Sequence, residues 1–182
     1  MVRSSAPTSM AAVGVMTSSV QSFPPIEAPG SRVLILGTMP GQESLRAGQY
    51  YAHPQNAFWR ILGDLLGFDR TLDYGLRVDR VRAADIAVWD VLRSCTRKGS
   101  LDSGIEPSSA VPNDFASFLA DHPQMQKICF NGAKAEALYA KHVRPHLLAA
   151  AELHYLRLPS TSPAHAGLPF SEKLRAWRAI LP

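Results

Sequence analysis

The sequence contains 182 residues, of which 46% are hydrophobic and 19% are charged, the composition of a folded domain rather than of a disordered chain. Its formal net charge of +4 at pH 7 permits an anionic partner without requiring one. Two cysteines, Cys95 and Cys129, are too few for a four-cysteine zinc or iron–sulfur site, and no apolar run is long enough to cross a membrane.

The first thirty residues are rich in Ser, Ala, Pro and Val. Their one apolar patch, Met10 to Met16, is short, contains a glycine and is followed by polar residues. This pattern predicts a disordered tail over residues 1–30 rather than a signal peptide. We therefore expect a single folded domain over residues 31–182. Nothing suggests a disulfide framework, which favours a reducing compartment, the cytoplasm.

The folded part is expected to begin with a strand over Arg32 to Leu36, covered on both faces. It runs into Gly37-Thr38-Met39-Pro40-Gly41, where two glycines allow the backbone to approach a ligand closely. A short helical segment is expected over residues 43–47. Asn56 is a candidate N-cap for a helix over residues 57–66, whose apolar residues recur at helical spacing.

The middle of the chain predicts one further strand and a helix. A short helix is expected within residues 69–84, and residues 85–90 predict the second strand. Residues 91–95 and 98–104 are expected to form a loop at the carboxyl end of that strand. Four polar residues there either bind a ligand or are simply solvated: Arg97, Lys98, Ser100 and Asp102. Asn113 is expected to cap a helix over residues 114–121.

Two more strands are expected over residues 127–131 and 153–158. Gly132 opens a helix over residues 133–142, and a polar loop over residues 159–167 follows the fourth strand. The last helix is expected to begin at the cap Ser171. It carries three basic residues on the side opposite its apolar residues, which we expect to be solvated: Lys173, Arg175 and Arg178.

Four strands that alternate with helices predict an α/β fold, a three-layer α/β/α sandwich with a central four-stranded parallel sheet. Ligands of such sheets bind at the carboxyl ends of the strands. The loops over residues 37–59, 131–134 and 159–167 all fall at those ends. Paired tyrosines, a histidine and amides in the first of them suit a pocket for a flat, hydrogen-bonding ring, unless its aromatic residues simply enter the core.

Familiar catalytic motifs are missing from these loops. None of the three loops contains a phosphate-binding motif, a Gly-x-Ser-x-Gly elbow or a His-x-x-x-His pair. The loops instead offer amides, hydroxyls, aromatic rings and backbone N–H groups at helix starts. Such groups stabilise anions and orient water but are weak nucleophiles. We therefore expect no metal and no cofactor.

In order along the chain, Gly37 to Gly41, Phe130-Asn131-Gly132 and Leu158 to His165 resemble the three motifs of the uracil-DNA glycosylase superfamily. Tyr50 to Trp59 resembles the signature of its hypoxanthine-DNA glycosylase branch. The resemblance covers roughly residues 31 to 181. Two features depart from the pattern: Thr38 and Met39 stand where most branches have Asp, Asn or Glu, and Leu158 stands where the uracil enzymes commonly have His.

The resemblance implies a monofunctional DNA glycosylase of base-excision repair that flips a deaminated base, hypoxanthine or uracil, out of DNA and hydrolyses its N-glycosidic bond. It maps the catalytic amide, which holds the attacking water, onto Asn56. His53 or His165 then hydrogen-bonds the departing base, and residues 163–166 wedge into the duplex. No lysine lies in the motifs, so simple hydrolysis is expected. The implied partner is DNA with deaminated bases, and we expect a monomer.

The remaining site residues follow from the same resemblance. Those expected to contact the base are Met39, Tyr51, Phe58, Phe130 and Asn131. Those expected to contact the DNA backbone or the gap are Gly37, Thr38, Pro40, Gly41, Ser44, Ser160, Thr161, Ser162, Pro163 and His165.

Structural roles remain open for several of these residues. Asn56 is also a candidate helix cap, Asn131 is a candidate for satisfying a strand end, and Phe58 suits the core. His53, beside a proline, suits the shaping of a turn. Two other functions also remain open: a non-catalytic module that recognises lesions in DNA, and a hydrolase of free nucleosides or nucleotides.

Overall fold

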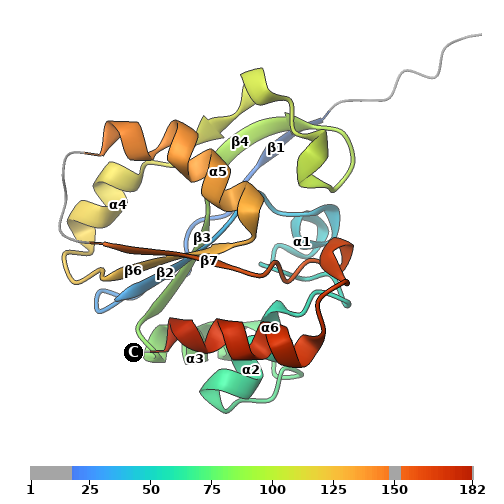
Figure 1. The fold of residues 1–182 in the computed structure, drawn as a ribbon, viewed down its shortest axis with the longest axis vertical. Coiled ribbons are helices and arrows are strands. Elements are labelled where there is room, and N and C mark those ends of the chain that lie inside the picture. The colour runs from blue at the N-terminus through green and yellow to red at the C-terminus, as the bar shows by residue number, and fades with distance from the viewer. Residues whose placement is uncertain (1–17, 148–152, 182) are drawn as a thin grey trace, which may run out of the picture.

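A computed structural model describes residues 18–147 and 153–181 and contains a four-stranded parallel sheet in the order β3-β2-β6-β7 (Figure 1). Its strands are β2 (Val33–Gly37), β3 (Ile86–Asp90), β6 (Lys127–Asn131) and β7 (His154–Leu158). All five residues of β2 and of β3 are buried, as expected for strands covered on both faces. The four predicted strands are confirmed.

Helices cover both faces of this sheet (Figure 1). On one face lie α4 (Phe115–Asp121) and α5 (Ala133–His142). On the other lie α2 (Phe58–Leu66), α3 (Tyr74–Ala83) and α6 (Phe170–Trp177). The short helix α1 (Gln42–Ala47) lies beyond the carboxyl end of β2. The α/β/α sandwich is therefore confirmed. Short 3-10 turns cover Asp102–Gly104, Pro107–Ser109, Arg144–His146, Pro163–His165 and Arg178–Ile180.

A second, antiparallel sheet corrects two expectations. It joins β1 (Ser18–Gln21), β4 (Leu92–Arg97) and β5 (Val111–Pro112). The predicted loop over residues 91–95 is thus largely strand, because β4 pairs with β1 and β5. The predicted disordered tail is wrong from Ser18 onward, because Val20 and Ile26 pack in the core; residues 1–17 lie outside the described residues.

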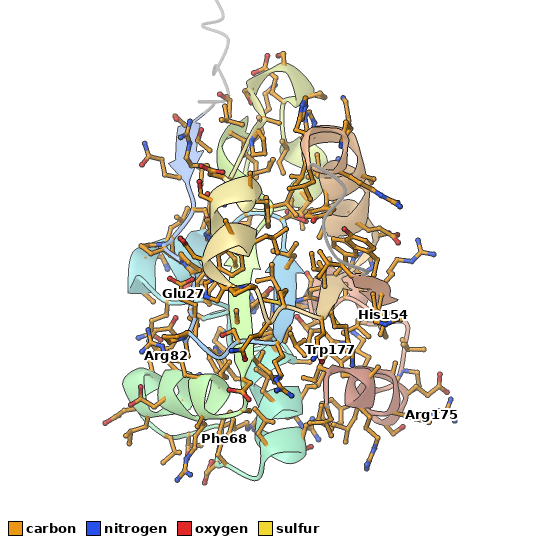
Figure 2. The ribbon with its side chains drawn as sticks, turned by 90° about the vertical axis from the view of Figure 1, so that its left-hand side faces the viewer. Glu27, Phe68, Arg82, His154, Arg175 and Trp177 are labelled. Carbon is orange, nitrogen blue, oxygen red and sulfur yellow. The ribbon has the colours of Figure 1, made fainter. Side chains whose placement is uncertain are left out.

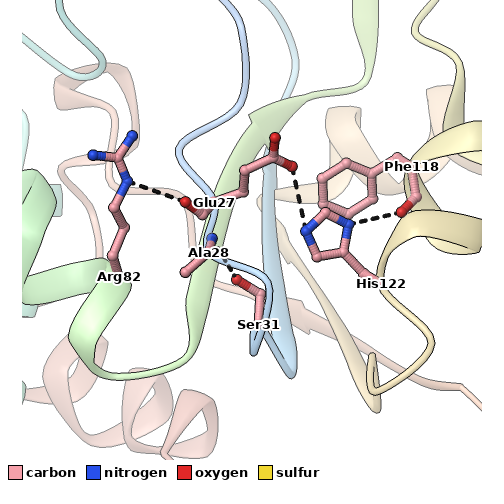
Figure 3. A network of polar contacts seen from close by, with 6 residues as sticks. All are labelled: Glu27, Ala28, Ser31, Arg82, Phe118 and His122. Carbon is pink, nitrogen blue, oxygen red and sulfur yellow. Dashed lines mark hydrogen bonds and ion pairs between the residues drawn. The ribbon is translucent and has the colours of Figure 1, made fainter.

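Polar contacts hold the segment before β2 against α3 and α4 (Figure 3). The backbone carbonyl of Glu27 accepts a hydrogen bond from Arg82 Nε at 3.1 Å. The Glu27 carboxylate lies 3.4 Å from His122 Nε2. His122 is buried, stacks on Phe118 and places its Nδ1 2.8 Å from the Phe118 carbonyl oxygen. These contacts show that the N-terminal segment is part of the fold.

Two predicted helix starts are also corrected. Asp114 rather than Asn113 caps α4, because its carboxylate accepts the Ser117 N–H, while Asn113 Nδ2 donates to the Asp90 carbonyl oxygen. Helix α6 begins at Phe170 after Pro169, where a proline costs nothing because the first N–H groups of a helix have no partner within it. The predicted helix within residues 69–84 is confirmed as α3.

Lys173 is not part of a solvated face of α6. Its exposed fraction is only 6%, whereas Arg175 and Arg178 are exposed. Figure 2 shows Arg175 directed away from the molecule and Trp177 directed into it. Trp177 is fully buried and packs edge-on against Phe58 of α2. Helix α6 thus buries one face that includes a lysine.

Candidate active site

A cavity of about 760 Å³ opens at the carboxyl ends of the parallel strands. It brings together the motif after β2, the end of β6 and the loop after β7, as predicted. A loop that follows β4 adds a fourth wall. The lining comprises residues 37–44, Tyr50, Tyr51, His53, Asn56, Asp90, residues 100–103, Asn131, Lys134 and residues 160–165.

The closed end of the cavity is built around Gly37 and Asp90, which are paired in the register of β2 and β3. A Cβ atom on residue 37 would lie 2.5 Å from Asp90 Oδ1 and 2.8 Å from the Tyr51 hydroxyl oxygen. Only glycine therefore leaves room for these two groups. The other Asp90 oxygen, Oδ2, accepts a hydrogen bond from Ser22 at 2.9 Å. Oδ1 and the tyrosine hydroxyl are thus the polar atoms available at this end.

Tyr51 is held in a strained conformation. Its backbone φ is 53°, in the left-handed region that costs a non-glycine residue about 1–2 kcal/mol. Its ring stacks on Phe58 with 3.8 Å between centroids and 21° between planes. Burial raises its pKa, so the hydroxyl stays protonated. Among the described residues, this buried hydroxyl makes no well-formed hydrogen bond, although the Asn131 side chain lies near enough to lower its pKa in part. Such a group is available to a ligand.

Asp90 is a buried acid. Its exposed fraction is 3%, and burial raises its pKa to about 7, although the hydrogen bond from Ser22 acts in the opposite direction. Burial also raises the pKa of Asp102, which lines the same cavity. A carboxyl group with a pKa of about 7 is protonated in about half of the molecules at pH 7 and in most of them at lower pH. In that form it can donate a hydrogen bond, which an ionised carboxylate cannot.

Asn56 is not the N-cap that its position suggested, because Ala57 occupies the N-cap position of α2. Asn56 Oδ1 accepts the Phe58 N–H at 3.0 Å, at the start of α2. The next residue, Ala57, donates its N–H to the Thr161 carbonyl oxygen at 3.0 Å. These bonds fix the Asn56 carboxamide beside the loop that follows β7. The second lone pair of Oδ1 is left to contact a water in the cavity. The contact with the Phe58 N–H is therefore compatible with the predicted catalytic role of Asn56.

His53 is exposed and lines the cavity. Its Nδ1 accepts the Gln55 N–H at 3.2 Å, a contact that shapes the turn. In the neutral imidazole this bond leaves the proton on Nε2. The contact thus fixes the ring as a hydrogen-bond donor toward a ligand.

Asn131 ties a strand end to a loop. Its Oδ1 accepts the Thr161 N–H and its Nδ2 donates to Thr161 Oγ1, both at 2.9 Å. The strand-end role that the sequence left open is therefore present. Asn131 also lines the cavity, but only one of its amide protons is left for a ligand.

Two predicted base-contact residues are corrected. Phe58 is fully buried between Tyr51, Trp59 and Trp177, and Phe130 is 2% exposed and packs against Tyr139 and Tyr155. Neither ring lines the cavity. The other predicted contacts all line it: Met39, Tyr51 and Asn131 on the base side, and Gly37, Thr38, Pro40, Gly41, Ser44, Ser160, Thr161, Ser162, Pro163 and His165 on the backbone side.

The loop after β4 belongs to the site rather than to solvent. Arg97 is only 1% exposed and its guanidinium donates to the carbonyl oxygens of Pro40 and Gly99 at 2.6 and 3.0 Å. Ser100 Oγ accepts the Gln42 N–H at 3.3 Å. The loop therefore fixes the turn that follows β2. Asp90 and Lys134 also line the cavity, although the sequence analysis did not predict them there. Asp90 could have been predicted, because it is a carboxylate at the carboxyl end of a buried strand.

Comparisons with known proteins identify chains that are similar to this one. The family model described as the uracil DNA glycosylase superfamily matches residues 24–181. Two relatives named hypoxanthine DNA glycosylase, from Methanosarcina barkeri and Methanosarcina acetivorans, are each 36% identical over 116 residues, which is 63% of this chain and 72% of theirs. The solution NMR structure of a candidate uracil DNA glycosylase from M. acetivorans is similar with a TM-score of 0.72 and 31% identity, over 90% of this chain and 99% of that one.

Proposed function

Because the chain belongs to the uracil-DNA glycosylase superfamily, we propose that it is a monofunctional DNA glycosylase that hydrolyses the N-glycosidic bond of deaminated bases, hypoxanthine before uracil. The observation that carries this proposal is the convergence of Asn56, the Gly37 turn and the Ser160 loop on one cavity. The names of the two Methanosarcina relatives support hypoxanthine as the first base.

The cavity suits a nucleotide rotated out of a duplex. Its volume of about 760 Å³ lies within the range of small-molecule sites, about 300–1,000 Å³. Residues 38–44 and 160–165 line it, and they include backbone N–H groups and hydroxyls of the kind that contact phosphates. The flipped base enters toward Asp90 and Tyr51, and the sugar remains near Asn56.

Asp90 and Tyr51 have the polarity to select deaminated bases. Deamination of adenine or cytosine replaces an amino group with a carbonyl and adds a proton to the neighbouring ring nitrogen. Neutral Asp90 donates through Oδ1 to that carbonyl, and the Tyr51 hydroxyl accepts from the ring N–H. The parent base presents an amino donor to the Asp90 donor, so a buried group is left unpaired, which rejects the parent base.

The reaction needs a water and an anion-stabilising donor. The bond between C1′ and the base nitrogen breaks with its electron pair on the base, and the sugar passes through a cation-like transition state. The water held by Asn56 attacks C1′, and the proton that it loses is matched, through solvent, by the proton that the base anion gains, leaving a neutral free base and an abasic site. His53 Nε2–H or His165 hydrogen-bonds the departing base, and neutral Asp90 stabilises the same negative charge.

We also propose that the protein acts as a monomer in the cytoplasm. None of the described helices is long and apolar enough to span a membrane. Cys95 and Cys129 are buried free thiols, which fits a reducing compartment.

A panel of end-labelled duplexes that each carry one hypoxanthine, uracil, adenine or cytosine at the same position tests the function. The protein is expected to yield alkali-cleavable abasic sites with hypoxanthine, more slowly with uracil, and none with the parent bases. A gel shift without abasic sites would indicate a lesion-binding module instead. Release of base from free deoxyinosine but not from DNA would indicate a nucleoside hydrolase.

A further inference from the structure

A second hollow, of about 380 Å³, lies on the other side of the loop that forms the wall of the main cavity. Ser160, Ala164 and His165 line both spaces, so the loop over residues 159–165 separates them. The lining of the second hollow comprises Pro159, Ser160, Ala164, His165, Gly167, Leu168 and Lys173. Ser160 and His165 already have expected roles at the main cavity, whereas Lys173 has none.

Lys173 is the charged group of this hollow. Its exposed fraction is 6%, and its Nζ donates to the His165 carbonyl oxygen at 2.8 Å. An ammonium group carries three donors, and no carboxylate of the described residues lies within ion-pair distance of it. Burial lowers its pKa. A buried cation without a counter-ion is unfavourable, and an anion in the hollow would remove that cost.

The surroundings of Lys173 are fixed rather than adaptable. One helical turn later, Trp177 Nε1 donates to the Pro159 carbonyl oxygen at 2.9 Å. The same face of α6 therefore holds both ends of the loop. Ser160 also faces the hollow, and its Oγ accepts the Ser162 N–H at 3.2 Å, which leaves the hydroxyl proton free to donate. The hollow thus presents an ammonium and a hydroxyl from two rigid elements.

We propose that this hollow binds a phosphate of the DNA backbone next to the flipped nucleotide, with Lys173 as the ion-pairing group and Ser160 as a hydroxyl donor. The inference rests on the proposed function, because it is the polymer that supplies a phosphate beside the main cavity. A flipped nucleotide occupies one side of the loop and its neighbouring phosphate the other. Lys173 then holds the wedge residue His165 and the backbone at the same time.

The test compares Lys173→Met with Arg175→Met in equilibrium binding to a duplex that carries a stable abasic-site analogue. Both changes remove one positive charge from α6, but Arg175 is directed away from the molecule (Figure 2). Loss of one phosphate contact reduces the slope of log affinity against log salt by about 0.9. The affinity gap between wild type and Lys173→Met should therefore shrink roughly threefold from 50 to 200 mM salt, while Arg175→Met keeps the wild-type slope.

Two further variants separate charge from structure. Lys173→Arg keeps the charge and should keep the wild-type slope, and Ser160→Ala should weaken binding without changing the slope. A Lys173→Met slope equal to wild type, or a Lys173→Arg slope equal to that of Lys173→Met, would overturn the phosphate site. If Lys173→Met fails to fold, Ser160→Ala decides, and unchanged affinity in that variant overturns the site. Hypoxanthine release by the wild type, measured separately, shows whether the proposed function itself stands.

Discussion

Asp90→Asn is the most informative substitution at the closed end of the cavity. Burial raises the pKa of Asp90 from 3.8 to about 7, so the folded protein binds this proton more tightly than the unfolded chain. The free energy of unfolding is therefore expected to fall as pH rises from about 4 to about 7. This pKa difference corresponds to at most roughly 4 kcal/mol. Asparagine has the same shape, stays neutral and can keep the Ser22 hydrogen bond.

Urea denaturation at pH 5 and pH 8 measures this effect. Asp90→Asn is expected to be more stable than wild type at pH 8 by up to roughly 4 kcal/mol, with a smaller difference at pH 5. Asp64→Asn, which removes an exposed carboxylate from α2, is the matched control and should change neither value by more than about 0.5 kcal/mol. An equal difference between wild type and Asp90→Asn at both pH values would refute the raised pKa of a buried Asp90.

The same variant tests the role of Asp90 in catalysis. For the wild type, kcat/KM for hypoxanthine release is expected to fall as pH rises above 7, because an ionised Asp90 no longer donates and repels the departing anion. The Asp90→Asn amide donates at every pH, so this variant should retain activity without that fall. Asp90→Leu has no donor and should lose about 10²–10³ in kcat. A wild-type fall that persists in Asp90→Asn would assign the titration to another group.

Two further substitutions test the packing of the site. Gly37→Ala should reduce hypoxanthine release at least tenfold, because its Cβ would displace Asp90 and Tyr51. The control Gly75→Ala, where a Cβ meets nothing within 4 Å, should keep the wild-type rate of release. Equal rates for the two variants would contradict the close contact of residue 37 with Asp90 and Tyr51. Asn131→Ala should lower the free energy of unfolding in urea by about 1–3 kcal/mol, because it leaves Thr161 unpaired; unchanged stability would show that the tie between β6 and the loop is unimportant.

The sequence predicted the parallel sheet because its central strand carries an unbroken apolar run, Val33 to Leu36, and because the other strands alternate with helical segments. It did not predict β4, in which Arg93, Ser94 and Thr96 interrupt the apolar pattern. Such a strand is stabilised by pairing with β1 and β5, partners that are distant in sequence. Residues 18–30 were missed for the same reason, since their composition resembles a tail until β4 and β3 are placed beside them.

For the candidate site, too, some features could be predicted from the sequence and others could not. Its location was predictable, because loops at the carboxyl ends of parallel strands converge. The roles of single residues were less predictable, because they depend on distant partners. Asn131 is engaged by Thr161, which is 30 residues away. Arg97 and Lys173 are buried although such residues are normally exposed, and Phe58 supports Tyr51 from behind instead of contacting the cavity.

Free hypoxanthine released from a duplex with a single deoxyinosine, measured for the wild type and for Asn56→Ala under single-turnover conditions, tests the central claim most directly. The wild type is expected to release the base and leave an intact abasic strand. Asn56→Ala is expected to bind the duplex with similar affinity and to release essentially no base. Full release by Asn56→Ala would remove this carboxamide from the mechanism and contradict the account of the site.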